Sequence, residues 1–389
     1  MSLRVGVLSP FWHNYNYGGK LQALAMVHLL QQFGCDACQI SYYQPSAARH
    51  RNIGKSLNMA LHSADYRSAI FQKMMGKCLP GAQSGIAVRK SAFDRYDAEI
   101  AHTQRVYTDA DIVQTVDDFD VFVCGSDQVW NPSLFKESYF LPFVPAQKYK
   151  FSYAASVANE LTQNWKAYFC NALSRFDAIS VREKKTQQML QQLLPDKEIF
   201  HVLDPTLMLP RETWTQLAVP VDVQKPYLLC YFLGYSHEQR RAAHAAARRT
   251  GKLLVTFPHL LGTAGRFYAC DVRFGDVQLY DVSPGQFIWL IQNADGVLTD
   301  SFHAAVLSTL FCRPLAVFGR TGSKDGGSRV LELLQMFGLE QHFCNHAAPD
   351  QVLPLLENPL LPKTQGFSRA RAASMAFLRA NLQNAENKK

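Results

Sequence analysis

The chain has 389 residues, 48% hydrophobic and 19% charged, which is more than one compact core usually holds, so two globular domains are expected. A formal net charge of +8 favours an anionic small substrate or a membrane surface, and no RNA-recognition, zinc-finger or basic-zipper pattern supports nucleic-acid binding. No apolar run approaches about eighteen residues, and the start lacks a signal-peptide cleavage site, so a cytoplasmic protein is predicted.

The nine cysteines are scattered along the chain, which predicts reduced thiols rather than disulfides. Only Cys35 and Cys38 have a spacing suited to metal or redox chemistry, and neither a second pair nor a histidine ligand accompanies them. No metal site is therefore predicted.

Strand-like and helix-like segments alternate through most of the chain, which indicates an α/β fold with parallel sheets and crossover helices. The predicted strands cover residues 3–9, 38–43, 120–124, 150–155, 178–182, 200–203, 227–233, 252–257, 277–280, 296–299 and 315–318. The predicted helices cover residues 19–33, 87–100, 161–173, 184–194, 284–293, 304–311, 329–337 and 367–382. A mobile loop or short helices are expected in the less regular region 45–84.

Three prolines, Pro210, Pro220 and Pro226, interrupt the stretch 209–226 and are typical of an interdomain connection. The expected division is a first domain at residues 1–210, a second at 211–360 and a terminal segment at 361–389. Within that segment a helix is expected to pack back across the first domain, and residues 383–389 are expected to fray.

Two glycines, Gly18 and Gly19, lie in the first strand-to-helix turn, residues 14–22 (NYNYGGKLQ). Paired glycines there would let a substrate approach backbone amides. The string matches neither a Walker loop nor a dinucleotide fingerprint, so turn geometry is the simpler interpretation.

The string GSDQVWN, residues 125–131, directly follows a predicted strand, so it should lie at the sheet edge where α/β proteins bind ligands. Ser126 and Asn131 offer neutral hydrogen bonds, Asp127 offers a base or a hydroxyl acceptor, and Trp130 offers a ring that stacks on a sugar. The alternative is a capped turn with a packed tryptophan, because serine and aspartate also cap helices.

Arg182 lies where the predicted strand 178–182 gives way to a helix. A guanidinium there can bind a carboxylate or phosphate through two parallel hydrogen bonds, which a lysine cannot match. A pair with Glu183 or another acid is the alternative.

Arg241, His244 and Arg248 share one face of the basic run 240–249 (RRAAHAAARR) if that run is helical. Such a face is most often simply solvated. Contact with a lipid surface is the alternative, and no catalytic role is expected.

The string DSFH, residues 300–303, places a hydroxyl and an imidazole where a buried strand ends and a helix begins. His303 should lie in the first helical turn, where free backbone N–H groups and the helix dipole favour an anion. It is expected to act on a phosphate or carboxylate substrate, and a histidine satisfied within the core is the alternative.

A glycine-rich string with three cations, residues 318–329 (FGRTGSKDGGSR), follows the next strand and could wrap an anion. Ser328 is also expected to cap the helix 329–337, so part of the string is structural.

Taken together and in this order, these strings resemble the polysaccharide pyruvyl transferase family over most of the chain. The matching pieces are residues 16–22, 125–131 (GSDQVWN), 153–156 (YAAS), 179–183 (ISVRE), 203–207 (LDPTL), 293–295 (NAD) and 299–303 (TDSFH), with a continuation through 329–339. Seven such pieces in family order make the resemblance specific.

The resemblance implies a fold of the GT-B type, with two Rossmann-like domains around a central cleft and a C-terminal helix returning to the first domain. It implies phosphoenolpyruvate as the donor, the first domain as the acceptor side and the second as the donor side. A glycan hydroxyl pair would be the acceptor, in the biosynthesis of a surface or exopolysaccharide such as a capsule. A lipid-linked acceptor and peripheral contact with the cytoplasmic membrane face stay open.

On this interpretation His303 is the general acid that protonates the methylene carbon of the donor, and Asp127 orients or deprotonates the acceptor. The donor would be held by Arg182, Ser301, Phe302, Arg320 and Lys324. The acceptor would be held by Asn16, Ser126, Gln128, Trp130 and Asn131. The scheme requires no metal and no cofactor besides the donor substrate. Ala304 stands where the family usually has glycine, and its methyl group is expected to narrow the pocket.

Two other functions stay open from the sequence. A nucleotide-sugar glycosyltransferase would share the two-domain architecture and would also need cations for a diphosphate. A catalytically silent glycan-binding or scaffold protein would use aromatic side chains for sugar stacking, and the presence of His303 and Arg182 argues against it.

Overall fold

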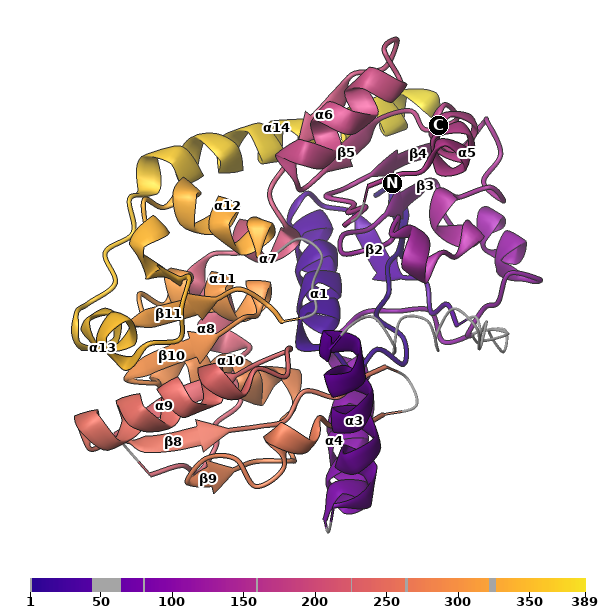
Figure 1. Ribbon diagram of the computed structural model, residues 1–389. Helices are drawn as coiled ribbons and strands as arrows, with labels where there is room; N and C mark the ends of the chain where they lie inside the picture. Colours follow the sequence, from indigo (N-terminus) through magenta and orange to yellow (C-terminus); the bar gives the residue numbers. More distant parts are fainter. Residues whose placement is uncertain are drawn as a thin grey trace.

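The computed structural model describes residues 2–43, 64–79, 81–158, 160–224, 226–262, 265–321 and 327–389. Figure 1 shows two α/β halves, each built on a parallel sheet with helices on its faces. None of the helices in these ranges is long and apolar enough to cross a membrane.

The first sheet has the strand order β2-β1-β3-β4, and all its pairings are parallel. Its strands are β1 (Arg4–Leu8), β2 (Asp36–Gln39), β3 (Val121–Cys124) and β4 (Tyr149–Ser152). A second parallel pair, β5 (Ile179–Val181) and β6 (Ile199–His201), continues it through single bridges beside β4. Its helices include α1 (Tyr17–Gln32), α5 (Gln163–Leu173) and α6 (Lys184–Leu193).

The second sheet has six parallel strands in the order β12-β11-β10-β7-β8-β9. The strands are β7 (Tyr227–Tyr231), β8 (Leu253–Thr256), β9 (Val277–Gln278), β10 (Gly296–Thr299), β11 (Leu315–Phe318) and β12 (Phe343–Cys344). The helices that follow them include α9 (His237–Thr250), α10 (Pro284–Asn293), α11 (Phe302–Leu310), α12 (Ser328–Met336) and α13 (Pro349–Glu357). The predicted α/β class with two Rossmann-like halves is confirmed.

Local sequence explains why several elements begin where they do. All four residues of β10 and of β11 are buried, as expected of central parallel strands covered on both faces. Helix α10 begins with a complete capping box between Ser283 and Gln286, with Pro284 at its first position. These three elements have the bounds that the sequence predicts.

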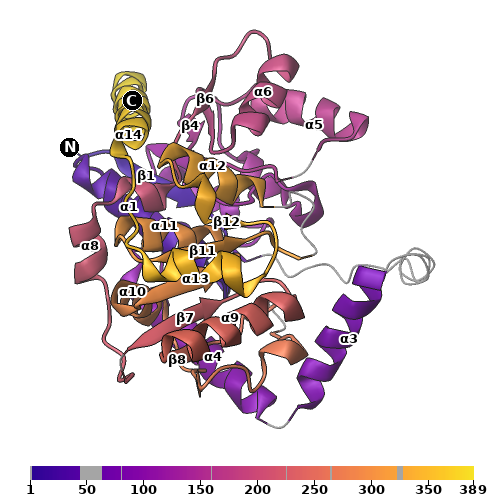
Figure 2. The same ribbon diagram turned by 60° about the vertical axis from the view of Figure 1, so that its left-hand side comes forward.

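A helical hairpin departs from the predicted division at residue 210. Helices α3 (Ala64–Cys78) and α4 (Ala82–Tyr96) belong to the first half in sequence but pack against the second, as Figure 2 shows. Arg89 on α4 donates hydrogen bonds to the carbonyl oxygens of Pro258, Leu279 and Tyr280, at 2.6–3.1 Å. The second half is therefore completed by residues from the first.

The two halves also share one hydrophobic core. Tyr17 on α1 stacks on Phe287 of α10, with ring centroids 4.3 Å apart and planes at 10°. Its hydroxyl donates a hydrogen bond to the carbonyl oxygen of Val282, at 2.9 Å. This contact fixes the start of α1 against the second half.

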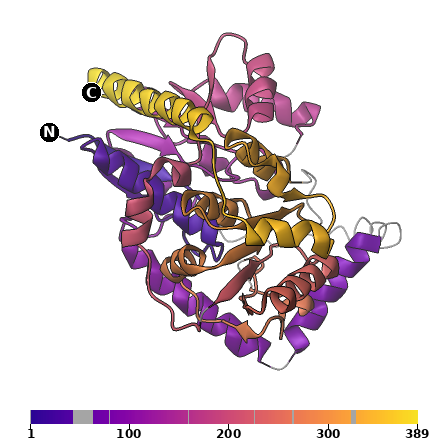
Figure 3. The ribbon, with the colours of Figure 1, turned by 90° about the vertical axis from the view of Figure 1, so that its left-hand side faces the viewer.

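Helix α14 (Thr364–Lys388) returns to the first half, as predicted, and Figure 3 shows it crossing the molecule. Asn381 accepts a hydrogen bond from the Tyr149 hydroxyl at 2.9 Å, and Phe377 packs near Phe151. The expectation that residues 383–389 fray is wrong, because the helix continues to Lys388. Ion pairs from Lys388 and Lys389 to two aspartates of the first half hold its end, at 2.7 and 2.9 Å.

Candidate active site

His303 lies in the first turn of α11, directly after the carboxyl end of β10, as the sequence predicts. Ser301 caps this helix, because its hydroxyl accepts a hydrogen bond from the backbone N–H of Ala304 at 3.4 Å. His303 as a whole is 8% exposed, so its imidazole is largely removed from solvent.

The ring of His303 reaches from the second half to the first. A Cβ atom placed on Gly18, at the start of α1, would lie 2.0 Å from the Nδ1 atom of His303. On the other side of the ring, Nε2 lies 3.8 Å from Oδ2 of Asp204. Nε2 is buried and has no hydrogen-bond partner among the described residues. Glycine at position 18 thus makes room for the imidazole.

Burial lowers the pKa of His303 below its ordinary value of about 6.5, and the nearby Arg182 and Arg329 act in the same direction. The carboxylates of Asp204 and Asp127 oppose this effect but do not cancel it. The imidazole is therefore neutral near pH 7 in this state.

Asp204 follows β6 and caps the short helix α7 (Pro205–Met208). Its Oδ1 accepts hydrogen bonds from the backbone N–H and the hydroxyl of Thr206, at 3.0 and 2.7 Å. Burial by itself would raise the pKa of Asp204, but His303, Arg182 and the bonds from Thr206 outweigh it and hold the pKa at about 2. Asp204 is a fixed anion beside the imidazole.

Arg182 joins three carboxylates and is almost fully buried, with 4% of its side chain exposed. It donates hydrogen bonds to Asp204 Oδ2 at 2.7 Å, Glu183 Oε1 at 3.2 Å and Asp127 Oδ1 at 3.3 Å. Its guanidinium carbon also lies 5.4 Å from the ring centroid of Phe302. Burial works against the charge, yet the three carboxylates raise the pKa of Arg182. In this state the guanidinium holds the carboxylates in place.

Asp127 adopts a left-handed backbone conformation, with φ of 70°. Aspartate tolerates this region better than most residues, and the turn here re-aims the chain at the end of β3. The Asp127 side chain is 20% exposed, against 1% for Asp204 and 10% for Glu183. Of these three carboxylates, Asp127 is the one that a substrate can reach.

Trp130 does not lie in the site, and the prediction that it stacks on a sugar is wrong. Its ring is 1% exposed, stacks on Phe140 and donates a hydrogen bond from Nε1 to the carbonyl oxygen of Tyr139 at 3.2 Å. Burial of the large apolar surface of the indole in the core of the first half stabilises the folded state.

The other predicted acceptor residues divide into two groups. Asn16 and Gln128 line the cleft. Ser126 is fully buried and donates its hydroxyl to Asp204 Oδ2 at 3.1 Å, so it supports the site without facing an acceptor. Asn131 lies behind Gln128 and donates an amide hydrogen bond to its Oε1 at 2.7 Å. Ser126 and Asn131 are therefore wrong as direct acceptor contacts.

The cleft between the halves gathers residues from both. It is lined by Asn16, Asp127, Gln128, Arg182, Leu233, Asp300, Ser301, Phe302, His303, Arg320, Gly327, Arg329 and Val330. The space that the centre of a water molecule can occupy in the cleft measures about 60 Å³.

Two cations enter this cleft from the second half. Arg320 follows β11 and forms no hydrogen bond or ion pair with another residue in the described ranges, while Arg329 lies in the first turn of α12. Lys324 lies outside the described residues. Ser328 is the first residue of α12 rather than its cap; Gly327 occupies the cap position with φ of 95°.

Asp300 links two loops of the second half. Its carboxylate accepts hydrogen bonds from the backbone N–H groups of Leu233 and Gly234, at 2.5 and 2.8 Å. Burial raises its pKa, although these bonds and the charge of Arg320 oppose the shift. It thus ties the end of β7 to the start of α11.

Ala304 points away from the cleft. It is fully buried in the shared hydrophobic core and is not among the residues that line the cleft. The expectation that its methyl group narrows the pocket is therefore wrong.

Two residues that the structure places in the site were given no role from the sequence. They are Asp204 and Asp300. Their place in the sequence could have indicated them, because each directly follows a predicted strand. Asp204 directly follows a predicted strand and precedes a proline, which marks a helix start.

Comparison with known proteins agrees with this architecture. The solved structures of UDP-N-acetylglucosamine 2-epimerases from Rickettsia bellii and Methanocaldococcus jannaschii are similar, each with a TM-score of 0.51, at 12% and 11% sequence identity. The similarity covers 100% of this chain and 98% of the first, and 98% of this chain and 99% of the second. At such identity it shows the fold alone, which is of the GT-B type.

Among curated proteins, no sequence matches the chain. The sequence model of one family, described as polysaccharide pyruvyl transferase, matches residues 16–322. This range includes the carboxylate cluster and His303. The chain belongs to the polysaccharide pyruvyl transferase family.

Proposed function

We propose that this protein transfers pyruvate from phosphoenolpyruvate to two hydroxyls of a glycan, forming a cyclic pyruvate ketal in surface or exopolysaccharide biosynthesis. One observation supports it above the others: His303 lies between cations of its own half and carboxylates of the facing half. The cations suit an anionic donor, and the carboxylates suit an acceptor whose hydroxyls must be oriented and deprotonated.

The donor carries a phosphate and a carboxylate. Arg320 and Arg329 supply positive charge in the cleft, and the N-terminus of α11 adds free N–H groups beside them. Ser301 and Phe302 border the same space, and Lys324 stays a predicted donor contact. Arg182 joins this set if the donor draws it from one of its three carboxylates.

In the first step a proton passes from His303 to the methylene carbon, and the first acceptor hydroxyl forms a C–O bond to the neighbouring carbon. The C=C π bond breaks, and the hydroxyl proton goes to Asp127. The product of this step is a phosphorylated ketal in which the former methylene is a methyl group.

In the second step the C–O bond to phosphate breaks, and the second hydroxyl closes the ring at the same carbon. Phosphate leaves with the proton of that hydroxyl, and the proton held by Asp127 returns to His303. Donor and diol thus become ketal and inorganic phosphate, with the protein unchanged.

The lowered pKa of His303 is compatible with an acid role once the donor is bound. The negative charges of the donor favour the imidazolium, so they raise a pKa that burial holds down. His303 would then be protonated in the complex with the donor and mostly neutral in the free protein.

The test incubates the protein with phosphoenolpyruvate and candidate glycan acceptors, and follows phosphate release together with acceptor mass. We expect equimolar phosphate and a mass gain of pyruvate minus water, with a rate about 100-fold to 10,000-fold lower for His303→Ala. Sugar transfer from a nucleotide donor would contradict the proposal in favour of a glycosyltransferase. Glycan binding without phosphate release across the panel would contradict it in favour of a scaffold.

A further inference from the structure

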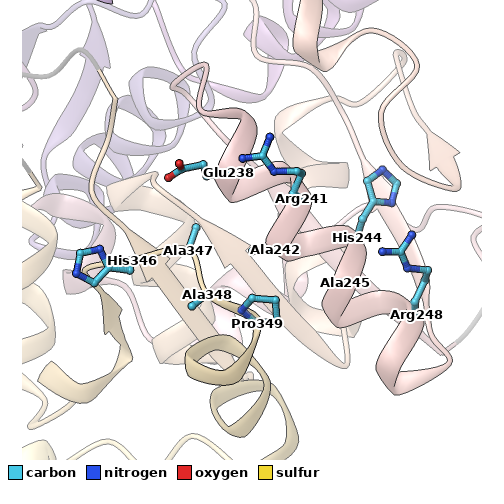
Figure 4. Close-up of a pocket in the computed structure, with 10 residues that line it drawn as sticks. All are labelled: Glu238, Arg241, Ala242, His244, Ala245, Arg248, His346, Ala347, Ala348 and Pro349. Atoms are coloured by element: carbon cyan, nitrogen blue, oxygen red, sulfur yellow. The ribbon is translucent and has the colours of Figure 1, made fainter.

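A large open groove lies away from the cleft, on the outer side of the second half. It measures about 720 Å³ and runs between α9 and the segment that leads from β12 into α13. Its lining residues are Glu238, Arg241, Ala242, His244, Ala245, Arg248, His346, Ala347, Ala348 and Pro349, drawn in Figure 4. We name it the α9 groove.

Basic side chains border the α9 groove on both sides. Arg241, His244 and Arg248 follow one another along α9, and His346 comes from the opposite segment, as Figure 4 shows. Arg241, Arg248 and His346 are exposed. The three residues of α9 occupy the one helical face that the sequence predicts for them.

No other described residue neutralises the charges of Arg241 and Arg248. Within the described ranges Arg241 and Arg248 form neither an ion pair nor a hydrogen bond, and Glu238 is the only carboxylate in the lining. Their neighbours differ, because Arg249 pairs with Asp350 at 3.1 Å and Arg240 is buried against an aspartate. Arg241 and Arg248, which line the groove, are therefore available to bind a ligand.

The floor of the α9 groove is made of small uncharged residues. Ala242, Ala245, Ala347 and Ala348 leave space between the two basic borders. Arg241 and Arg248 are seven residues apart, which places them about 10 Å apart along the helix axis. The groove therefore offers two separate anion positions rather than one.

We infer that the α9 groove binds the phosphate headgroups of an anionic phospholipid membrane. Charge complementarity supports this occupant, since each exposed cation near such a surface strengthens attachment. The net charge of +8 acts in the same direction. No phenylalanine, tyrosine or tryptophan is among the described residues that line the groove, so it lacks the large aromatic stacking surface typical of a single-stranded nucleic-acid site.

The α9 groove adjoins the loop that carries Arg320 into the cleft. Gln239, at the start of α9, donates a hydrogen bond to the carbonyl oxygen of Gly319 at 2.8 Å. A membrane held at α9 would thus lie on the donor side of the cleft rim. This inference is independent of the proposed reaction, because vesicle binding is measured without donor or acceptor.

The experiment measures co-sedimentation of the full chain with vesicles of phosphatidylglycerol and phosphatidylcholine, against vesicles of phosphatidylcholine alone. We expect binding to the anionic vesicles only, and a loss of about 30-fold in the partition coefficient for the double variant Arg241→Gln/Arg248→Gln. The double variant Arg241→Lys/Arg248→Lys, which keeps both charges, should bind like the wild type.

A matched control separates a local site from overall charge. Arg369 and Arg379 are exposed on α14, which Figures 1 and 2 show at the other end of the molecule from α9. Arg369→Gln/Arg379→Gln removes the same net charge and should change binding by less than about threefold, since distant charges are screened. Equal losses in the two glutamine variants would overturn the inference, as would unchanged binding in the groove variant or equal binding to neutral vesicles.

Folding is checked by far-UV circular dichroism of each variant. If Arg241→Gln/Arg248→Gln does not fold, the single variants Arg241→Gln and Arg248→Gln are compared with Arg369→Gln instead, and each groove variant should lose about fivefold in the partition coefficient. If inorganic diphosphate at low concentration abolishes the binding of the wild type to anionic vesicles, the groove is a site for a soluble anion and the inference is overturned.

Discussion

His303 is subject to opposing influences, because burial lowers the pKa of its ring while two carboxylates raise it. A general acid acts only while it is protonated, so the rate should fall as pH rises through that pKa. Since kcat/KM reports the free protein and kcat the complex, the falling limb should lie below pH ~6.5 in kcat/KM and at higher pH in kcat. Steady-state kinetics across pH ~5–8 measures both limbs.

The donor phosphate also titrates in this range, and Asp204→Asn distinguishes the two groups. Removing this carboxylate takes away a charge that raises the pKa of His303, so the limb in kcat/KM should move to lower pH. The titration of the donor is the same for both proteins. An unmoved limb in the variant would mean that His303 is not the group observed.

The sequence predicted His303 and Arg182 because each lies at a strand-to-helix junction within a motif. It did not predict that Arg182 is occupied by three carboxylates, or that Ser126 turns inward to Asp204. Ser126 and Asp204 are 78 residues apart in the chain, and only the packing of β3 against the later strands brings them together. Trp130 was ambiguous for a related reason, since a packed and a sugar-stacking tryptophan have the same local sequence.

The contact between α1 and α11 sets the position of the reactive ring. Gly18→Ala places a methyl group 2.0 Å from the present position of Nδ1 of His303, so the ring must shift. A displacement of about 1 Å costs on the order of 100-fold in rate, and we expect kcat to fall by about that factor. Circular dichroism and kinetics with phosphoenolpyruvate check the fold and the rate together.

Ala304→Gly, one residue after His303 on α11, provides the matched comparison. Ala304 is buried in the core and does not line the cleft, so we expect a loss of about 1–2 kcal/mol in the free energy of unfolding. The rate and the KM for the donor should change by less than about twofold. A large fall in donor KM would restore the idea that this methyl group narrows the pocket.

Most strands and long helices were predictable because hydrophobic pattern and end signals agree. The residues of β10 and β11 are all buried, and a capping box starts α10, so local sequence is enough to define them. The two-residue strand β12 was missed, since so short a strand has no period to detect. Helix α3 lies in a region whose apolar pattern is weak, and tertiary contacts with the second half support it.

The hydrophobic core that the two halves share predicts that they unfold together. Tyr17→Ala removes a ring that stacks on Phe287, and we expect a loss of about 3–5 kcal/mol in the free energy of unfolding. Tyr17→Phe keeps the ring and loses the hydrogen bond to Val282, which should cost about 1 kcal/mol. Urea denaturation should give one transition for the wild type, and two separate transitions would contradict a common core.

The packing of α14 has a consequence for the order in which the chain can fold during synthesis. The aromatic ring of Phe151, from the middle of the sequence, packs near Phe377 of this last helix. On a translating ribosome the first sheet is made early, yet its final cover emerges only after the entire second half. The first half must therefore wait with apolar surface uncovered, and a nascent chain halted before residue 364 should depend on chaperones to stay out of aggregates.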